Sequence, residues 1–249
     1  MVHLANNGLS HSTIRTYISA ISFVHKMHHS TDPTSAFIVA KTLQGIKNIS
    51  APPPDQRLPI TINILHQLLQ ALPFALPDNH NHILWRSIFL LAYHACLRAG
   101  ELTQSKNLDN VLQLHQISVT PLQLTIQFTA YKHSQGRTPS ITVHAQSPDT
   151  PCPVTSIRQY LSIRGQHPGQ LFLNPNFSPV TIQQFSSVLQ TAATMSALPA
   201  HRYGTHSFRI GKATQMASDG HTDQAIQRAG RWKSSAYSKY IRPDNITPP

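Results

Sequence analysis

The chain has 249 residues, of which 40% are hydrophobic and 12% charged, so it can fold around a core and is too weakly charged for general disorder. It carries 20 Lys and Arg against 9 Asp and Glu, giving a net charge of +11 and an isoelectric point near 10.1. This charge indicates a polyanionic partner, and we favour nucleic acid over an anionic membrane surface. The two cysteines form no spacing motif, so we expect reduced thiols in an intracellular protein.

The most apolar stretch of the sequence predicts a buried helix. ILWRSIFLLAYHACL is interrupted by Arg86 and His94 and falls short of the about 18 apolar residues that a membrane span needs. No leader pattern follows Met1, so we expect neither secretion nor a membrane partner. The histidine groups HKMHH and HNH lack ligand partners at a recognised spacing, so we expect no metal.

The first 50 residues predict a small helical module. STIRTYISAISFVHKMH has apolar residues at helical spacing and a cap at Ser10 or Ser12, and TSAFIVAKTLQGIKN predicts a second helix. Three consecutive prolines in SAPPPDQRLP then exclude a helix. We therefore expect a module over residues 1–50, a linker over 51–59 and a main domain over 60–249.

The main domain is predicted to be mostly helical. Helices are expected in ITINILHQLLQAL and in NHILWRSIFLLAYHACL, the latter running up to Arg98. LQLTIQFTAYK and TPSITVHA alternate around the turn HSQGR and predict a hairpin with Lys132 at its turn end. Further helices are predicted in PVTSIRQYLSIRG, TIQQFSSVLQTAATMSA, SFRIGKATQMAS, TDQAIQRAGR and SSAYSKYI. The expected fold class is α+β, mostly α, with a small antiparallel sheet.

Each candidate functional residue has an ordinary structural explanation when it is taken alone. Arg98 and Glu101, three residues apart, are compatible with a simple helix ion pair. His206 can cap or pack at a helix start, and Lys132 can be a solvated turn residue. Trp232 can belong to a core.

The order of these residues along the chain is more informative. The stretches ACLRAGEL, YKHSQGRTPSITV, CPVTSIRQYL, THSFRIGKAT and AGRWKSSAYSKYIR resemble the catalytic domain of the tyrosine recombinases, the phage integrase family. The N-terminal STIRTYISAISFVHKMH resembles the end of that family's core-binding domain, so residues 1–50 are expected to be a partial DNA-binding domain. The ending GRW…YIR is most similar to recombinases of eukaryotic mobile elements.

The resemblance implies an enzyme that cuts and rejoins DNA through a 3′-phosphotyrosyl intermediate, without metal or cofactor. Arg98 and Arg209 would bind the phosphate and Tyr240 would be the nucleophile, while Tyr237 is the alternative. The remaining roles would fall to His206 as proton acceptor or orienting group, Trp232 as a donor, Lys132 as general acid and Glu101 as the support of Arg98.

The resemblance also implies double-stranded DNA as partner and a homotetramer on DNA. Most of the other basic residues are expected to meet phosphates, although a solvated surface position is the better interpretation of any single one. They include Arg15, Lys26, Lys41, Lys47, Arg158, Arg164, Lys212 and Lys233. The expected location is the nucleus if the source is eukaryotic and the cytoplasm otherwise. Two other functions stay open: a catalytically silent DNA-binding protein derived from a recombinase, and a relaxing enzyme like the type IB topoisomerases.

Overall fold

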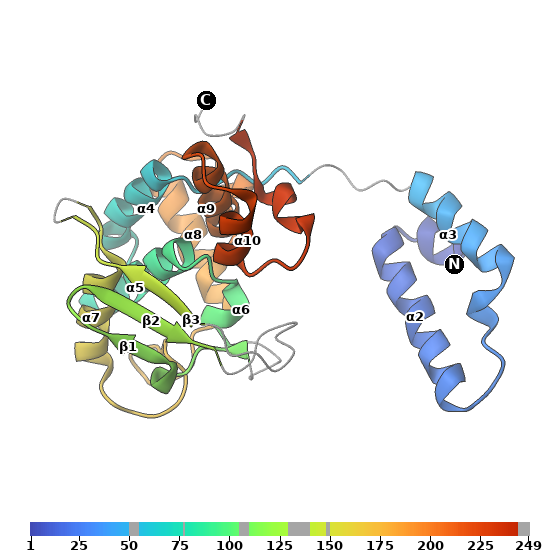
Figure 1. Ribbon diagram of the computed structural model, residues 1–249, viewed down its shortest axis with the longest axis horizontal. Coiled ribbons are helices and arrows are strands. Elements are labelled where there is room, and N and C mark those ends of the chain that lie inside the picture. Colours follow the sequence, from blue (N-terminus) through green and yellow to red (C-terminus); the bar gives the residue numbers. More distant parts are fainter. Residues whose placement is uncertain (50–54, 77, 105–109, 129–139, 148–149, 244–249) are drawn as a thin grey trace. The chain divides into compact units, whose positions relative to one another are not determined.

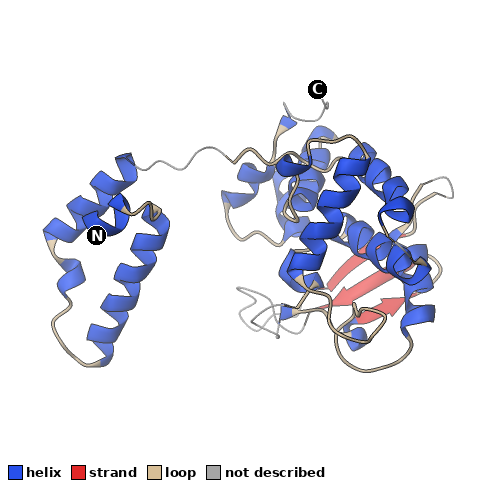
Figure 2. Cartoon of the chain, turned by 180° about the vertical axis from the view of Figure 1, so that it is seen from behind, coloured by secondary structure: helices blue, strands red, loops and turns tan. Residues whose placement is uncertain are grey.

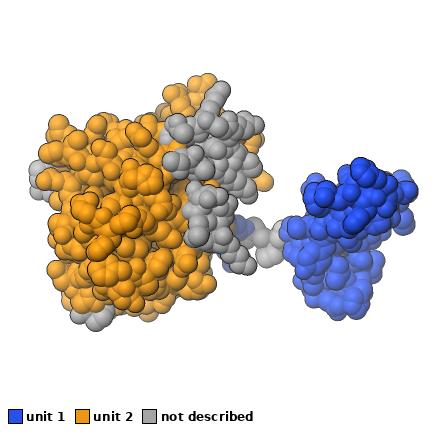
Figure 3. Space-filling model, turned by 90° about the horizontal axis from the view of Figure 1, so that it is seen from below, with its two compact units in different colours: residues 1–56 blue, residues 57–249 orange. Residues whose placement is uncertain are grey.

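The computed structural model describes residues 1–49, 55–76, 78–104, 110–128, 140–147 and 150–243. The chain forms two compact units, Met1–Gln56 and Arg57–Pro249, which Figure 3 colours separately. Their boundary falls within the predicted linker 51–59. The identity of the first unit as a DNA-binding module stays a prediction.

The first unit consists of the helices α1 (Val2–Asn6), α2 (His11–Met27) and α3 (Phe37–Ile49), with the 3-10 turn η1 (Pro33–Ser35) between the last two. Ser10 caps α2 by accepting a hydrogen bond from the Thr13 N–H, one of the two caps expected. The Asp32 carboxylate accepts hydrogen bonds from Ser22 and Thr34, which lower its pKa to about 2. These polar contacts tie the end of α2 to the turn that precedes α3.

The second unit opens with the helices α4 (Ile62–Ala75) and α5 (Asn79–His94). α5 packs against α4, α7 (Pro153–Arg164) and α9 (Ser207–Ser218), while α8 (Ile182–Met195) packs against α4. Phe89, Phe185 and Phe208 meet where α5, α8 and α9 come together, with ring centroids 5.2–5.9 Å apart. This buried aromatic cluster fixes α9, which begins next to His206.

The sheet has three antiparallel strands, β1 (Ile117–Val119), β2 (Gln123–Gln127) and β3 (Ser140–His144), in that order. They gather on one side of the helical part of the unit (Figure 2). β2 and β3 pair as the predicted hairpin, with Leu124 opposite Val143 and Ile126 opposite Ile141. The mostly helical fold with a small antiparallel sheet agrees with the predicted fold class.

The C-terminal part consists of η4 (Ala200–Arg202), α9, α10 (Asp223–Gly230) and η5 (Ser235–Tyr240). A short extended segment around Ile60 runs against α9, and an added Cβ on Gly211 would lie 1.7 Å from the Ile60 carbonyl oxygen. Glycine is therefore required at position 211 for close approach of the two backbones. SSAYSKYI was predicted as a helix and is a 3-10 helix over Ser235–Tyr240.

One predicted boundary is wrong. The helix expected to run up to Arg98 ends at His94, and the chain turns at Cys96, whose φ of 49° is left-handed. A separate short helix, α6 (Ala99–Leu102), begins after Arg98. Arg98 therefore lies at a helix start and does not continue α5. The sequence pattern also missed the short elements α1 and β1.

Within the described ranges, the structure has no helix both long and apolar enough to cross a membrane.

Candidate active site

Arg98 is held by Glu101 at the start of α6. The Arg98 backbone N–H donates to Glu101 Oε2 at 2.7 Å, and its guanidinium NH1 donates to Glu101 Oε1 at 3.2 Å. The carboxylate thus caps the helix and orients the guanidinium at the same time. The Arg98 side chain remains 31% exposed while that of Glu101 is only 4% exposed. The pair leaves part of the guanidinium facing solvent.

Arg209 lies in the first turn of α9 and is 1% exposed. Its NH1 donates to the Cys96 carbonyl and its NH2 donates to the Gly230 carbonyl at 2.9 Å. Its Nε has no partner among the described residues. Burial lowers the pKa of the guanidinium from its usual value, although a guanidinium retains its charge in proteins. Arg209 therefore places a positive charge beneath the site and joins three distant segments.

His206 and Tyr240 form a hydrogen bond across the site. His206 Nε2 and Tyr240 Oη lie 2.8 Å apart, and the two ring centroids are 5.0 Å apart. His206 immediately precedes α9 and Tyr240 is the last residue of η5. The Tyr240 carbonyl accepts a hydrogen bond from Thr214 Oγ1 at 3.1 Å, so both the backbone and the phenol of Tyr240 are fixed.

The Trp232 ring covers the Arg209 guanidinium. Arg209 Cζ lies 4.6 Å from the Trp232 ring and 5.7 Å from the Tyr240 ring, and the two ring centroids are 4.8 Å apart. An added Cβ on Gly230 would lie 1.8 Å from the Trp232 ring. The absence of a side chain at position 230 therefore leaves room for the indole over the buried charge.

Trp232 and Tyr240 border an open pocket of about 470 Å³. Its wall combines cationic groups, an indole and the phenol, from residues Arg98, Arg231, Trp232, Lys233, Ser234, Ala236 and Tyr240. Described acidic residues do not line it, and the nearest one named above, Glu101, is already paired with Arg98. The pocket is suited to an anion with several oxygen acceptors.

The two candidate nucleophiles have different environments. Tyr237 is buried in a small cluster with Ala213, Met216 and Ile226. A hydrogen bond with Asp223, followed by burial, raises the pKa of the Tyr237 phenol, which disfavours a phenolate there. Tyr240 instead borders the pocket and contacts His206. Of the two tyrosines, Tyr240 is the one that lies at the pocket.

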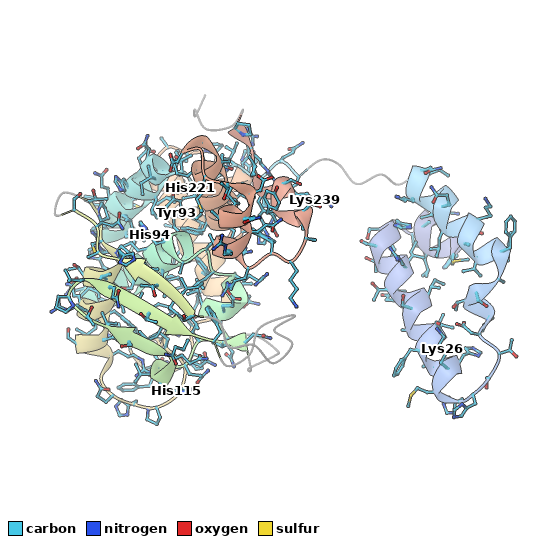
Figure 4. The ribbon with its side chains drawn as sticks, viewed as in Figure 1. Lys26, Tyr93, His94, His115, His221 and Lys239 are labelled. Atoms are coloured by element: carbon cyan, nitrogen blue, oxygen red, sulfur yellow. The ribbon has the colours of Figure 1, made fainter. Side chains whose placement is uncertain are left out.

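The other predicted basic contacts differ among themselves. Arg15, Lys26 and Lys47 are exposed on the first unit, and Lys26 is labelled in Figure 4. The Lys26 ammonium lies 3.8 Å from Asp32. Lys41 and Arg158 are also exposed, and Lys233 lies on the pocket wall. These placements are compatible with phosphate contacts.

Two basic residues lie inside the fold. Lys212 is partly buried, with its ammonium 5.7 Å from the centroid of the Tyr93 ring, and burial lowers its pKa. Arg164 is buried and donates to the carbonyls of Leu171, Gly165, His167 and Gln170. The expectation that Arg164 meets phosphate is therefore wrong, because its donors hold the loop after α7. The charge of Lys212 is likewise directed into the protein.

Lys132 belongs to the segment between β2 and β3 that lies outside the described residues, so its predicted place near the site stays a prediction.

Arg231 was not singled out by sequence, yet its NH2 donates to Glu101 Oε2 at 2.7 Å. The only sequence signal for it is its place between Gly230 and Trp232. Within the described part of the chain, no group of three or more metal-ligating side chains is present.

The fold and the site together define a class of mostly helical protein with an arginine- and tyrosine-lined pocket. The sequence profile of the phage integrase family matches residues 63–245, more than half of the chain. The chain therefore belongs to the phage integrase family. No curated protein matches it by sequence.

Solved structures share the fold at low sequence identity. The XerH site-specific recombinase bound to its difH substrate in a pre-cleavage complex is 18% identical, with a TM-score of 0.65, over 96% of this chain and 64% of that one. The Tn1549 transposon integrase in complex with circular intermediate DNA is 15% identical, with a TM-score of 0.60, over 97% and 78%. A lambda integrase dimer bound to a core site is 14% identical, with a TM-score of 0.56, over 96% and 66%.

Proposed function

We propose that this chain is a DNA strand transferase, a tyrosine recombinase that cuts and rejoins double-stranded DNA through Tyr240. Membership of the phage integrase family supports this class of reaction. The observation that carries the proposal is the 2.8 Å hydrogen bond between Tyr240 and His206, together with the pocket that Tyr240 and Arg98 both border. A phenol, an imidazole and a guanidinium thus lie near one another, and these are the groups that the proposed reaction needs.

The proposed reaction begins with attack of Tyr240 Oη on a DNA phosphorus atom. An ordinary phenol has a pKa near 10, so it needs to lose its proton as it attacks near neutral pH. A neutral His206 with an unprotonated Nε2 would accept that proton along the existing hydrogen bond. The bond from phosphorus to the 5′ oxygen then breaks, which leaves a 3′-phosphotyrosyl link.

The departing 5′ oxygen also needs a proton. We assign this role to Lys132, which the hairpin between β2 and β3 would carry toward the DNA. One phosphodiester bond is exchanged for another, so a 5′ hydroxyl from a second DNA end can reverse the step. The proposed chemistry requires neither a metal nor a cofactor.

The two arginines would stabilise the charge that develops on the non-bridging oxygens. Arg98 already exposes part of its guanidinium to the pocket, whereas Arg209 lies under Trp232 and Tyr240. Movement of the Tyr240 ring toward a phosphate would uncover Arg209 on the pocket side. Donors of this kind commonly contribute about 3–4 kcal/mol each to lowering a barrier.

We further propose that the first unit binds DNA and that the active form is a tetramer on two duplexes. The exposed cations Arg15, Lys26 and Lys47 support contact with phosphates. The ending GRW…YIR supports an origin in a eukaryotic mobile element, for which the nucleus would be the place of action.

A suicide duplex tests the proposal. A nick placed just beyond the cleavage position lets the short fragment that carries the new 5′ hydroxyl diffuse away. A covalent protein–DNA adduct then accumulates and is measured on a denaturing gel. Wild type and Tyr237→Phe are expected to form the adduct, while Tyr240→Phe is expected to form none. Tyr237→Phe is a matched control because it removes the same hydroxyl from a tyrosine three residues away.

The same assay separates the rival functions. Absence of adduct from wild type on duplexes with several element-end sequences would favour a silent DNA-binding protein. Adduct formation together with relaxation of a supercoiled plasmid, without exchange between two sites, would favour the topoisomerase-like function.

A further inference from the structure

Arg231 is a buried cation at the pocket that the mechanism above does not use. Its NH2 donates to Glu101 Oε2 at 2.7 Å, and the two side chains are only 5% and 4% exposed. Its Cζ lies 4.4 Å from the Phe128 ring, at the end of β2. The guanidinium is therefore fixed on two sides, by a carboxylate and by an aromatic ring.

Glu101 is shared between two arginines. The Glu101 carboxylate lies 2.7 Å from the Arg231 guanidinium and 3.2 Å from that of Arg98. The Arg231 side chain is 5% exposed, whereas that of Arg98 is 31% exposed. A charge pair shielded from water interacts more strongly than an exposed one. We propose that Arg231 is a positioning residue that takes up the charge of Glu101 and thereby leaves the Arg98 guanidinium free to bind a phosphate; this inference rests on the proposed function.

A charge count explains why this matters for an anion. Arg98, Glu101 and Arg231 together carry one net positive charge, which faces the pocket through Arg98. Without Arg231, Glu101 and Arg98 would form a neutral pair. A carboxylate also matches the fork of a guanidinium, so both donors of Arg98 would be drawn to it and away from the phosphate.

The backbone at Arg231 also connects the Arg231–Glu101 pair to Arg209. Arg231 ends α10 with φ 53°, a left-handed conformation that is unfavourable for residues with a side chain. The preceding residue, Gly230, accepts from Arg209, and the following residue, Trp232, covers it. The contacts of Arg231 with Glu101 and Phe128 therefore also hold the turn that aligns Arg209.

A mutant cycle tests this inference. The four proteins are wild type, Arg231→Met, Glu101→Gln and the double variant, and the measurement is the rate of adduct formation at saturating suicide duplex. Arg231→Met is expected to be slower by about 10²-fold, the loss typical for one phosphate-stabilising donor. Adding Glu101→Gln to Arg231→Met is expected to raise the rate of adduct formation again by about tenfold. The double variant again has one net positive charge, and Gln releases the Arg98 guanidinium. A double variant as slow as Arg231→Met, or slower, would overturn the inference.

Two further variants separate positioning from general stability. Arg231→Lys keeps the charge and is expected to lose less than Arg231→Met. Arg164→Met removes an arginine that is also buried but stands at the end of α7, where it holds the following loop, and is expected to lower the urea midpoint without slowing adduct formation. An equal loss of rate in Arg164→Met would show that Arg231 acts through stability alone, and would overturn the inference.

Failure of the proposed function has a different signature. If wild type forms no adduct, the proposed function fails, and the urea midpoints of the same cycle still test the pairing of Arg231 with Glu101. Additive midpoints would show that the two side chains are not coupled and would overturn the inference as well. Non-additive midpoints would support the pairing on which it depends.

Discussion

The substitution Gly230→Ala tests how the site is assembled, because the added methyl group meets only the Trp232 ring among the three nearest atoms. An added Cβ would lie 1.8 Å from Trp232 Cζ3 and 2.1 Å from Trp232 Cε3, far closer than two carbon atoms approach. The obstacle is a side chain, so the indole is expected to swing aside while α10 stays in place. Gly230→Ala should therefore uncover Arg209 on one face.

The expected loss of stability follows from the contacts of the ring. The indole lies 4.6 Å from the Arg209 guanidinium, a cation–π contact of about 0.5–2 kcal/mol. It also pairs with the Tyr240 ring at 4.8 Å, for about 0.5–1.5 kcal/mol. The preference of alanine over glycine in a helix offsets up to about 1 kcal/mol. The net destabilisation should be about 1–2 kcal/mol.

Urea unfolding and adduct formation measure the two consequences separately. Because the displaced ring is a proposed donor to the phosphate, the rate is expected to fall by about 10²-fold, more than stability alone predicts. Gly45→Ala in α3 is the matched control, since an added Cβ there meets no atom within 4 Å. It should leave the rate unchanged. Wild-type stability and rate in Gly230→Ala would refute the role given to Trp232.

Three other outcomes are expected. Gly211→Ala places a Cβ 1.7 Å from the Ile60 carbonyl oxygen, so its urea midpoint should fall by the equivalent of about 3 kcal/mol, and an unchanged midpoint would contradict the close approach of the two backbones. Burial, followed by the charge of Lys212, lowers the pKa of His94 to about 4 from 6.5; the side chain is labelled in Figure 4. The unfolded chain therefore binds a proton that the folded one does not, and stability should fall as pH drops from about 6.5 to about 4, by up to about 3 kcal/mol. A His94→Asn protein with the same pH slope would argue against this. Arg209→Ala should abolish adduct formation and His206→Ala should slow it by about 10²–10⁴-fold, whereas small, equal effects would contradict both roles.

The helices of the second unit were predictable because their apolar spacing is long and regular, as in α4 and α5. The end of α5 was not predictable, although only three residues lie between His94, where it ends, and Arg98, where it was expected to end. The left-handed turn at Cys96 is stabilised by a hydrogen bond from Arg209, 113 residues further along the chain. A local pattern contains no trace of such a distant contact.

The members of the candidate site could also be predicted from the sequence, whereas their contacts could not. The residue order Arg98, His206, Arg209, Trp232, Tyr240 pointed to one site, and the structure brings these five side chains around one pocket or directly beneath it.

Basic residues were harder to place, because composition gives the amount of charge but not the side on which it lies. Arg164 and Lys212 face inward, and Arg231 binds Glu101 across 130 residues of sequence.

The contacts of Arg209 also determine when during folding the site can exist. Among the described residues its guanidinium pairs with no carboxylate, and it donates to carbonyls supplied by Cys96 and Gly230. A growing chain that ends before residue 230 has the arginine but lacks one of these acceptors, the covering indole and the tyrosine. The proposed reactive centre therefore cannot assemble until residues 230–240 have been synthesised.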